Sequence, residues 1–132
     1  MNKIIAILLV VAVAAGAWFY LRSHRDAFAT LTPQQFSQLL ADTPDVQLID
    51  VRTPDEYTEG HLTAAKLFDV HDPMFAAKTT TMLAKDKSVA VYCRSGCRSR
   101  TAAQVLAKAG YRVYNLDGGI EAWKAAGLPT EP

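Results

Sequence analysis

Short apolar runs alternate with amphipathic segments along most of this chain, and helix-start signals stand between them. The first helical segment begins after Thr32, which can cap it, has Pro33 at its first position, and should end before Pro44. Residues 46–51 then form a nearly continuous apolar run, which is typical of a strand buried in a parallel sheet. Residues 53–56 carry the signature of another short helix start.

The same alternation continues toward the C-terminus. Three further strands and three further helices are predicted, the strands over 66–70, 89–93 and 112–116 and the helices over 73–84, 101–109 and 120–126. Gly110 and Gly127 suit helix ends, and residues 117–119 predict a turn. Strands that alternate with helices in this way favour an α/β fold, in which helices cover both faces of a mostly parallel sheet.

The first part of the chain breaks this pattern. Residues 4–21 carry no charge, and they are preceded by Lys3 and followed by Arg22 and Arg25. A helix of that length spans about 27 Å, which is close to the roughly 30 Å hydrocarbon core of a bilayer. We therefore assign residues 1–25 to a signal peptide or membrane anchor with its flanks, 26–30 to a linker, and 31–130 to the folded domain.

Two interpretations of the apolar segment stay open. The small residues 15–17 suit a signal-peptidase site, whereas the run continues through three aromatic residues at 18–20, as in the aromatic belt of a membrane interface. We favour an uncleaved, single-pass anchor in the inner membrane. Lys3 opposes Arg22 and Arg25, so flanking charge gives almost no orientation bias, and the signal-like layout favours a periplasmic domain.

Composition argues against several classes of function. The net charge is +1 and no basic stripe occurs, so we expect no nucleic-acid partner. The three histidines are scattered, and we expect no metal site and no cofactor. Two cysteines, Cys93 and Cys97, lie too close together to form a disulfide framework. Their clustering indicates reactive chemistry instead.

Reactive side chains follow two of the predicted strands. Asp50 and Arg52 stand at the end of one strand, and Cys93 stands at the end of another. The carboxyl ends of parallel strands share one sheet edge, which is where ligands bind in open α/β folds. Asp50 and Arg52 could line a site at this edge, or they could form an ion pair that only fixes the loop.

A cysteine at a strand end is by itself more often a small buried apolar residue. Here the arginines 94, 98 and 100 follow Cys93, and the loop leads into a helix N-terminus, which also favours an anion. Both features lower a thiol pKa. A thiol with a pKa of about 8.5 is only about 3% ionised at pH 7, whereas lowering its pKa by about two makes it roughly three-quarters ionised.

Three segments, in the right order, resemble the signatures of the rhodanese family. Cys-Arg-Ser-Gly-Cys-Arg-Ser at 93–99 is similar to the family's active-site loop. Residues 48–57 with Gly-His-Leu at 60–62 resemble its N-terminal signature, and residues 116–123 resemble its C-terminal one. The similarity covers roughly residues 31–129. One departure is Thr-Ala-Ala at 63–65, where the family usually has Pro-Gly-Ala, and it concerns the shape of that loop.

This resemblance implies a rhodanese-like fold, with a five-stranded, mostly parallel sheet between helices, here behind one N-terminal transmembrane helix. It also implies a sulfurtransferase that takes the outer sulfur of thiosulfate or a related small anion as a persulfide and passes it to cyanide or a thiol. Cys93 matches the catalytic cysteine. The matching substrate-binding residues are Arg94, Ser95, Gly96, Cys97, Arg98 and Ser99, with Arg94 and Arg98 as the cations.

Alternatives to this activity stay open at the level of sequence. A cysteine phosphatase or arsenate reductase also attacks with a thiolate in an anion-binding loop, but those families have five residues between cysteine and arginine. Counting from Cys93, that place is Ser99. A rhodanese module used only for binding or signalling is the other alternative. Cys97 is either a passenger thiol or a resolving thiol that could attack a Cys93 persulfide.

Overall fold

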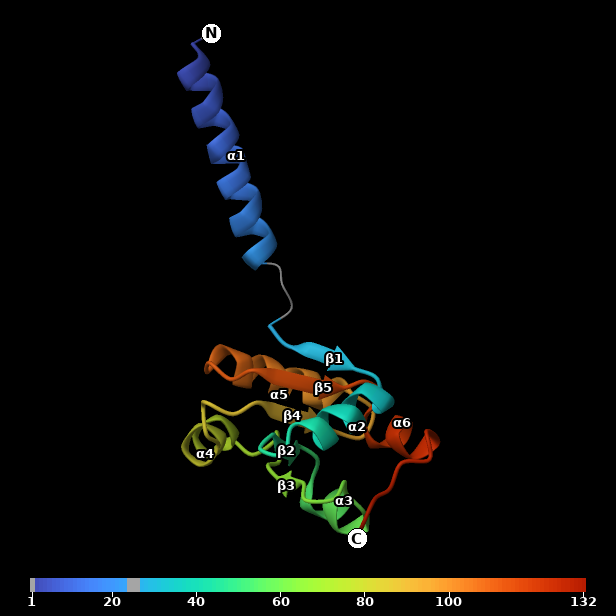
Figure 1. Cartoon of the computed structure of the whole chain (residues 1–132). Helices are drawn as coiled ribbons and strands as arrows, with labels where there is room; N and C mark the ends of the chain where they lie inside the picture. The colour runs from blue at the N-terminus through green and yellow to red at the C-terminus, as the bar shows by residue number, and fades with distance from the viewer. Residues whose placement is uncertain (1, 24–26) are drawn as a thin grey trace.

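The computed structural model describes residues 2–23 and 27–132 (Figure 1). The N-terminal helix α1 (Lys3–Ser23) contains an apolar window, Lys3–Tyr20, that is long and apolar enough to cross a membrane and is not buried against the rest of the chain. A signal sequence has the same properties. The predicted flanks at residues 24 and 25 and the first linker residue, 26, lie outside the described residues.

The domain is built on one five-stranded sheet in the order β1-β5-β4-β2-β3. Each pair of neighbouring strands in it is parallel. The strands are β1 (Ala29–Leu31), β2 (Gln47–Asp50), β3 (Lys66–Leu67), β4 (Val89–Tyr92) and β5 (Val113–Leu116). The α/β fold with a parallel sheet, expected from the alternation of elements, is confirmed.

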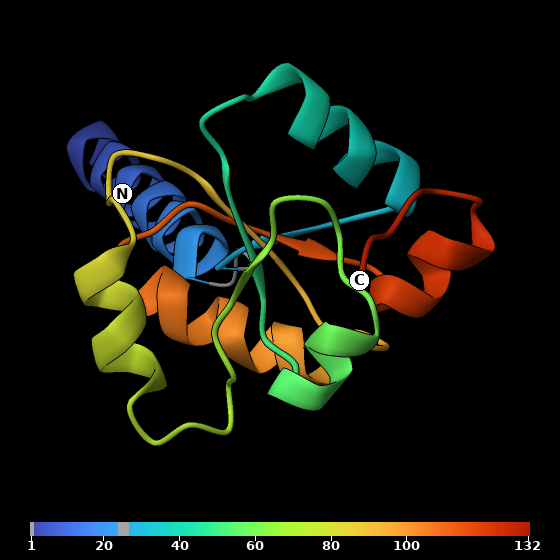
Figure 2. The ribbon, with the colours of Figure 1, turned by 90° about the horizontal axis from the view of Figure 1, so that it is seen from below.

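Helices cover both faces of this sheet, as Figure 2 shows from below. They are α2 (Pro33–Asp42), α3 (Pro54–Glu59), α4 (Phe75–Met82), α5 (Cys97–Lys108) and α6 (Gly119–Ala125). Side chains of α4 and α5 pack on one face, and side chains of α2 and α6 pack on the other. Thr32 caps α2 as predicted, through a hydrogen bond from the Gln35 amide.

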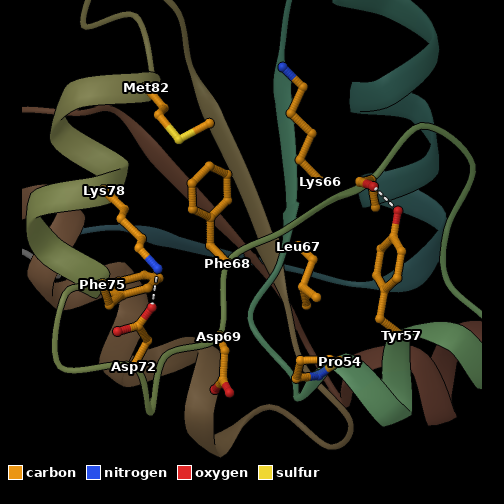
Figure 3. A pocket seen from close by; sticks show the side chains of 11 residues that line it. Pro54, Tyr57, Lys66, Leu67, Phe68, Asp69, Asp72, Phe75, Lys78 and Met82 are labelled. Carbon is orange, nitrogen blue, oxygen red and sulfur yellow. Dashed lines mark hydrogen bonds and ion pairs between the residues drawn. The ribbon is translucent and has the colours of Figure 1, made fainter.

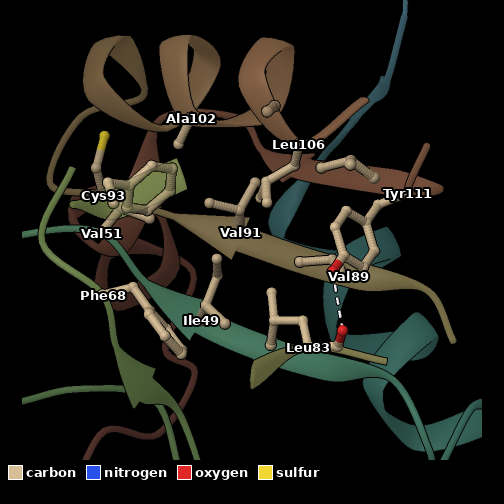
Figure 4. Close-up of a cluster of buried hydrophobic side chains, with 13 residues drawn as sticks. Ile49, Val51, Phe68, Leu83, Val89, Val91, Cys93, Ala102, Leu106 and Tyr111 are labelled. Carbon is tan, nitrogen blue, oxygen red and sulfur yellow. Dashed lines mark hydrogen bonds between the residues drawn. The ribbon is translucent and has the colours of Figure 1, made fainter. Parts of the chain in front are cut away.

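The two faces of the sheet bury alternate residues of the central strands. On β2, Ile49 faces the α4–α5 side and Leu48 faces the α2–α6 side. On β4, Val91 faces the α4–α5 side and Ala90 faces the α2–α6 side. Figure 4 shows the first of these clusters, with Cys93 at its end. Since strands buried on both faces have no polar side, their sequences are continuous apolar runs, and this is why they could be predicted.

The sequence prediction was wrong at the start of the domain. Residues 26–30 were assigned to a linker, but Ala29 and Thr30 belong to β1, which pairs with β5 at the edge of the sheet. A hydrogen bond from the Asp117 amide to the Leu31 carbonyl, at 2.8 Å, extends this pairing. Three half-exposed residues carry no recognisable period, so only the pairing with β5 defines this strand.

The departure at residues 63–65 has a visible structural consequence. Ala64 adopts φ +67°, in the left-handed region that favours glycine, within a turn closed by a 3.0 Å hydrogen bond from the Ala65 amide to the Leu62 carbonyl. The turn therefore keeps a glycine-like conformation without a glycine. For an alanine this conformation costs about 1 kcal/mol.

Candidate active site

The loop after β4 places Cys93 at the N-terminus of α5. Gly96 adopts φ +113°, which ends the loop and allows the helix to begin at Cys97. The sequence predicted a helix start at Thr101, so Arg98 and Ser99 lie in the first helical turn rather than in the loop. This early start directs the free amides at the helix N-terminus toward the end of β4.

The Cys93 side chain is enclosed, with 1% of its surface exposed. The Gly96 amide donates a hydrogen bond to its sulfur at 3.0 Å. Figure 4 shows the sulfur at the end of the core cluster, beyond Val51 and pointing away from Val91. The thiol is thus a terminal part of the core that faces the loop.

Burial is the largest influence on the pKa of Cys93 and raises it. The Ser99 hydroxyl, and then the amides of Ser99, Gly96 and Ser95, act in the opposite direction, and together they lower the pKa below its ordinary value of 9.0. The sequence attributed this effect to arginines and to the helix N-terminus. In the structure the Ser99 hydroxyl makes the largest contribution that lowers the pKa, and the amides around the N-terminus of α5 act in the same direction, as expected of a helix N-terminus.

Ser99 interacts with the thiol through both its hydroxyl and its backbone amide. Its side chain is fully buried, and its hydroxyl lies 3.2 Å from the Gly96 carbonyl, to which it donates a hydrogen bond. Since a hydroxyl carries one hydrogen, it can donate either to this carbonyl or to an ionised Cys93. A change in the charge of Cys93 would therefore move this hydrogen bond.

Arg98 was predicted to meet the substrate anion, but its guanidinium group is engaged by a carboxylate. It forms two hydrogen bonds with Glu56, from Nη1 to Oε1 at 2.6 Å and from Nη2 to Oε2 at 2.9 Å. Glu56 also caps α3, because the Thr53 amide donates to its Oε1 at 3.3 Å. Chiefly the hydrogen bonds from Arg98 lower the pKa of Glu56 to about 2, so the carboxylate is ionised at neutral pH.

Arg94 is paired in a similar way but in solvent. Its Nε lies 2.8 Å from Oε1 of Glu121, and both side chains are more than half exposed. Arg100 is exposed, and among residues 2–23 and 27–132 no carboxylate pairs with it. Cys97 is also exposed, at the first position of α5. Of the predicted substrate-binding residues, Arg94, Ser95 and Cys97 are thus exposed to solvent.

Asp50 and Arg52 form a buried ion pair. Nη2 of Arg52 lies 2.6 Å from the Asp50 carboxylate and also donates to the Gly60 carbonyl at 2.6 Å. Both side chains are at least nine-tenths buried. This geometry favours the second of the two roles considered for the pair, in which it ties the end of β2 to the loop before Leu62.

Sequence reasoning missed the part that α6 plays in this site. The amides of Ile120 and Glu121 donate to the carbonyls of Cys93 and Arg94, at 2.9 and 3.1 Å. A Cβ atom on Gly119 would lie 2.4 Å from the Arg94 carbonyl oxygen, and Gly119 has φ +62°. Only glycine permits this approach, so the Gly-Gly pair, interpreted from sequence as a turn, also supports the loop.

A groove of about 600 Å³ lies between α3, β3 and α4 (Figure 3). Its walls include Leu67, Phe68 and Phe75, and Cys93 does not line it. Phe68 and Phe75 belong to the core cluster that also contains Cys93. Within the described part of the chain, no group of three or more His, Cys, Asp or Glu side chains could hold a metal ion.

Comparison with known proteins decides the family. The model of the rhodanese-like domain matches residues 32–126, which include the Cys93 loop, the Glu56–Arg98 pair and α6. The chain belongs to the rhodanese-like domain family. This rhodanese-like chain is 44% identical over 97 residues to a protein named sulfurtransferase from Allochromatium vinosum, covering 73% of this chain and 88% of that one.

Two further comparisons agree with this assignment. The thiosulfate sulfurtransferase GlpE of Pseudomonas paraeruginosa is 31% identical over 101 residues, which cover 76% of this chain and 87% of GlpE. The solution structure of a rhodanese-like domain from Anabaena superposes with a TM-score of 0.68 at 30% identity, covering 77% of each chain. Relatives with these names support a sulfurtransferase at the level of the family.

Proposed function

We propose that this rhodanese-like domain is a sulfurtransferase in which Cys93 carries the transferred sulfur as a persulfide. One observation carries the proposal. The Cys93 sulfur accepts a 3.0 Å hydrogen bond from the Gly96 amide at the N-terminus of α5, and hydrogen bonds there lower the pKa of Cys93 although the thiol is buried. A thiolate held in this way is a nucleophile that needs no separate base.

Thiosulfate serves as the reference donor. The Cys93 thiolate attacks the outer sulfur, the S–S bond breaks, and sulfite leaves with the bonding electrons. The amides of Ser95, Gly96 and Ser99, which act on the Cys93 sulfur, are the hydrogen-bond donors available to the persulfide that forms there. Cyanide or a thiolate attacks that sulfur, leaves as thiocyanate or as a new persulfide, and restores the Cys93 thiolate.

Intact-mass measurement of the purified chain after incubation with thiosulfate tests this proposal. We expect one added sulfur atom on the wild type and on Cys97→Ser, and none on Cys93→Ser. Steady-state sulfur transfer to cyanide should be abolished in Cys93→Ser and largely kept in Cys97→Ser. Full activity in Cys93→Ser would sink the mechanism.

The same experiment separates the two roles of Cys97. A resolving Cys97 would attack the inner sulfur of the Cys93 persulfide, expel hydrosulfide and leave a disulfide between the two cysteines. Its replacement by serine would then lengthen the lifetime of the persulfide. An unchanged lifetime in Cys97→Ser would make it a passenger thiol.

Phosphatase or arsenate reductase activity is the competing proposal. It is disfavoured because four residues separate Cys93 from Arg98 and because Glu56 already occupies the Arg98 guanidinium group. A phosphoryl transition state presents three equatorial oxygens that need donors around a wider ring. Hydrolysis of an aryl phosphate that disappears in Cys93→Ser would establish this competing activity.

We further propose that α1 is an uncleaved inner-membrane anchor with the domain on the periplasmic side. The apolar helix continues past the small residues at 15–17 into the aromatic residues at 18–20, as an interfacial belt would. Protease protection in spheroplasts tests the orientation. Digestion of the domain in intact spheroplasts is expected, and full protection would place the domain in the cytoplasm.

A further inference from the structure

The two arginines that the loop offers to an anion differ in how their charge is balanced. Arg94 and Glu121 meet at 2.8 Å in solvent, with 67% and 55% of their side chains exposed, so water and salt screen both charges. Arg98 and Glu56 meet through two hydrogen bonds, and each side chain is only 24% exposed. A bound donor would therefore be affected mainly by the less screened charges of Arg98 and Glu56.

Arg98 is also the arginine whose charge acts on the reactive sulfur. It lies in the first turn of α5, one residue before Ser99, and it interacts electrostatically with Cys93. The paired Glu56 carboxylate is held at a fixed place by Arg98 and by the cap of α3. A negative charge thus stands permanently beside the single half-buried cation of the loop.

Sulfur donors differ in how much positive charge they need at this point. The thiosulfate dianion and the Cys93 thiolate bring three negative charges together. The products are a persulfide anion, which stays on Cys93, and a sulfite dianion, which leaves. The hydropersulfide of an uncharged thiol, in its protonated form R–S–S–H, brings only the charge of the Cys93 thiolate. The thiolate attacks the terminal sulfur, the S–S bond of the donor breaks, R–S⁻ leaves with the bonding electrons, and Cys93–S–S–H remains.

We propose that Glu56 is a specificity-determining residue, which neutralises Arg98 and thereby disfavours the thiosulfate dianion, relative to uncharged hydropersulfides, as a donor to Cys93. This inference rests on the proposed sulfurtransferase function and narrows its donor class. Glu56 acts through Arg98 and does not touch the reacting sulfur. Its effect is on the relative rates with two donors rather than on the ability of Cys93 to accept sulfur.

The variant Glu56→Gln tests the proposal with little change in shape. Glutamine can keep the oxygen that caps α3, since glutamine serves the same position in the cap of α2. It removes the charge and replaces Oε2, the acceptor for Arg98 Nη2, with an amide NH2 group. The measurement is kcat/KM for thiosulfate and for the hydropersulfide of 2-mercaptoethanol, an uncharged thiol, with the same acceptor. We expect the ratio of thiosulfate to persulfide to rise about tenfold, or about 1.4 kcal/mol, as one partly screened unit charge is removed.

Two matched controls remove the same charge elsewhere. Glu59→Gln alters an exposed carboxylate on the same helix, α3, and Glu121→Gln alters the solvent-exposed pair. Both should change the donor ratio less than about twofold, because solvent screens these charges. If the donor ratio rose as much in these controls as in Glu56→Gln, the overall charge of the protein would explain the effect, and the proposal would be overturned.

A second variant keeps the proposal testable even where Glu56→Gln does not fold. Arg98→Gln leaves the Glu56 carboxylate uncompensated, so it should lower the donor ratio about tenfold. An unchanged ratio in Arg98→Gln, or in a folded Glu56→Gln, would refute the role of this pair. If neither donor adds sulfur to Cys93 in the wild type, the proposed function itself fails, and this outcome is distinct from an unchanged ratio.

Discussion

Replacing Ser99 by alanine should raise the pKa of the Cys93 thiol. Burial opposes ionisation of this sulfur, and the Ser99 hydroxyl is the largest influence in the other direction. Ser99→Ala removes that hydroxyl from a fully buried position and leaves the Ser99, Gly96 and Ser95 amides in place. The variant therefore isolates one donor from the set that stabilises the thiolate.

The size of this change follows from the strength of one charged hydrogen bond. Hydrogen bonds to ionised groups contribute about 1.5–3 kcal/mol, and each pKa unit corresponds to about 1.36 kcal/mol. The hydroxyl also gives up its 3.2 Å bond to the Gly96 carbonyl when it turns to the thiolate, which offsets part of the gain. We expect the pKa of Cys93 to rise by about one unit, and the thiolate fraction below that pKa to fall about tenfold.

The assay is the pH dependence of alkylation by iodoacetamide in a Cys97→Ser background, because the exposed second cysteine would otherwise react first. Thiolate absorbance in the ultraviolet gives the same titration without a reagent. Ser95→Ala is the matched control, since Ser95 acts on Cys93 through its backbone amide and its side chain is exposed. The control should titrate as the parent does.

The sign of the pH dependence can be stated in advance. The pKa of Cys93 is lower in the folded chain than its ordinary value of 9.0, so the stability contributed by the thiolate is present above pH 9 and is lost as pH falls through the folded pKa. Ser99→Ala should narrow the pH range between the folded pKa of Cys93 and 9. The fall in the rate of sulfur transfer on the acid side of its pH profile should then occur at higher pH. A titration of Ser99→Ala that coincides with that of Ser95→Ala would refute the assigned role of the hydroxyl.

Three further predictions follow from the backbone and from α1. Ala64→Gly should raise the free energy of unfolding by up to about 1 kcal/mol in denaturant titration, because it relieves a left-handed alanine at an exposed turn. Gly119→Ala should lower it by more than about 2 kcal/mol, since its Cβ would lie 2.4 Å from the Arg94 carbonyl oxygen, and an unchanged midpoint would contradict this contact. N-terminal sequencing of the membrane fraction should find an intact α1, whereas a soluble chain that begins at Trp18 would show cleavage.

The sequence was sufficient wherever the physical cause is local. The runs that became β2 and β4 are buried on both faces, so most of their residues are apolar whatever packs against them. Thr32 and Thr53 cap helices through bonds to groups three residues away, and this spacing is visible in a linear sequence. The order of strands and helices, and the place of Cys93 at a strand end, followed from the same kind of signal.

Tertiary structure decided the partners of the charged side chains. Glu56 and Arg98 are 42 residues apart and Arg94 and Glu121 are 27 apart, so no local period relates them. The sequence therefore assigned both arginines to the substrate, and only the packing of α3 and α6 against the loop brought carboxylates to them. Gly119 is the same case, because its need for a bare Cα arises from backbone that lies distant in sequence.

The edge strand β1 shows the remaining limit. Two exposed residues and the partly buried Leu31 have no intrinsic preference strong enough to define a strand, and their pairing with β5 supplies the hydrogen bonds that do so. A linear sequence thus determined which residues must be buried and which groups are reactive. The approach of distant segments decided what those groups touch, because a contact depends on the positions of both of its partners.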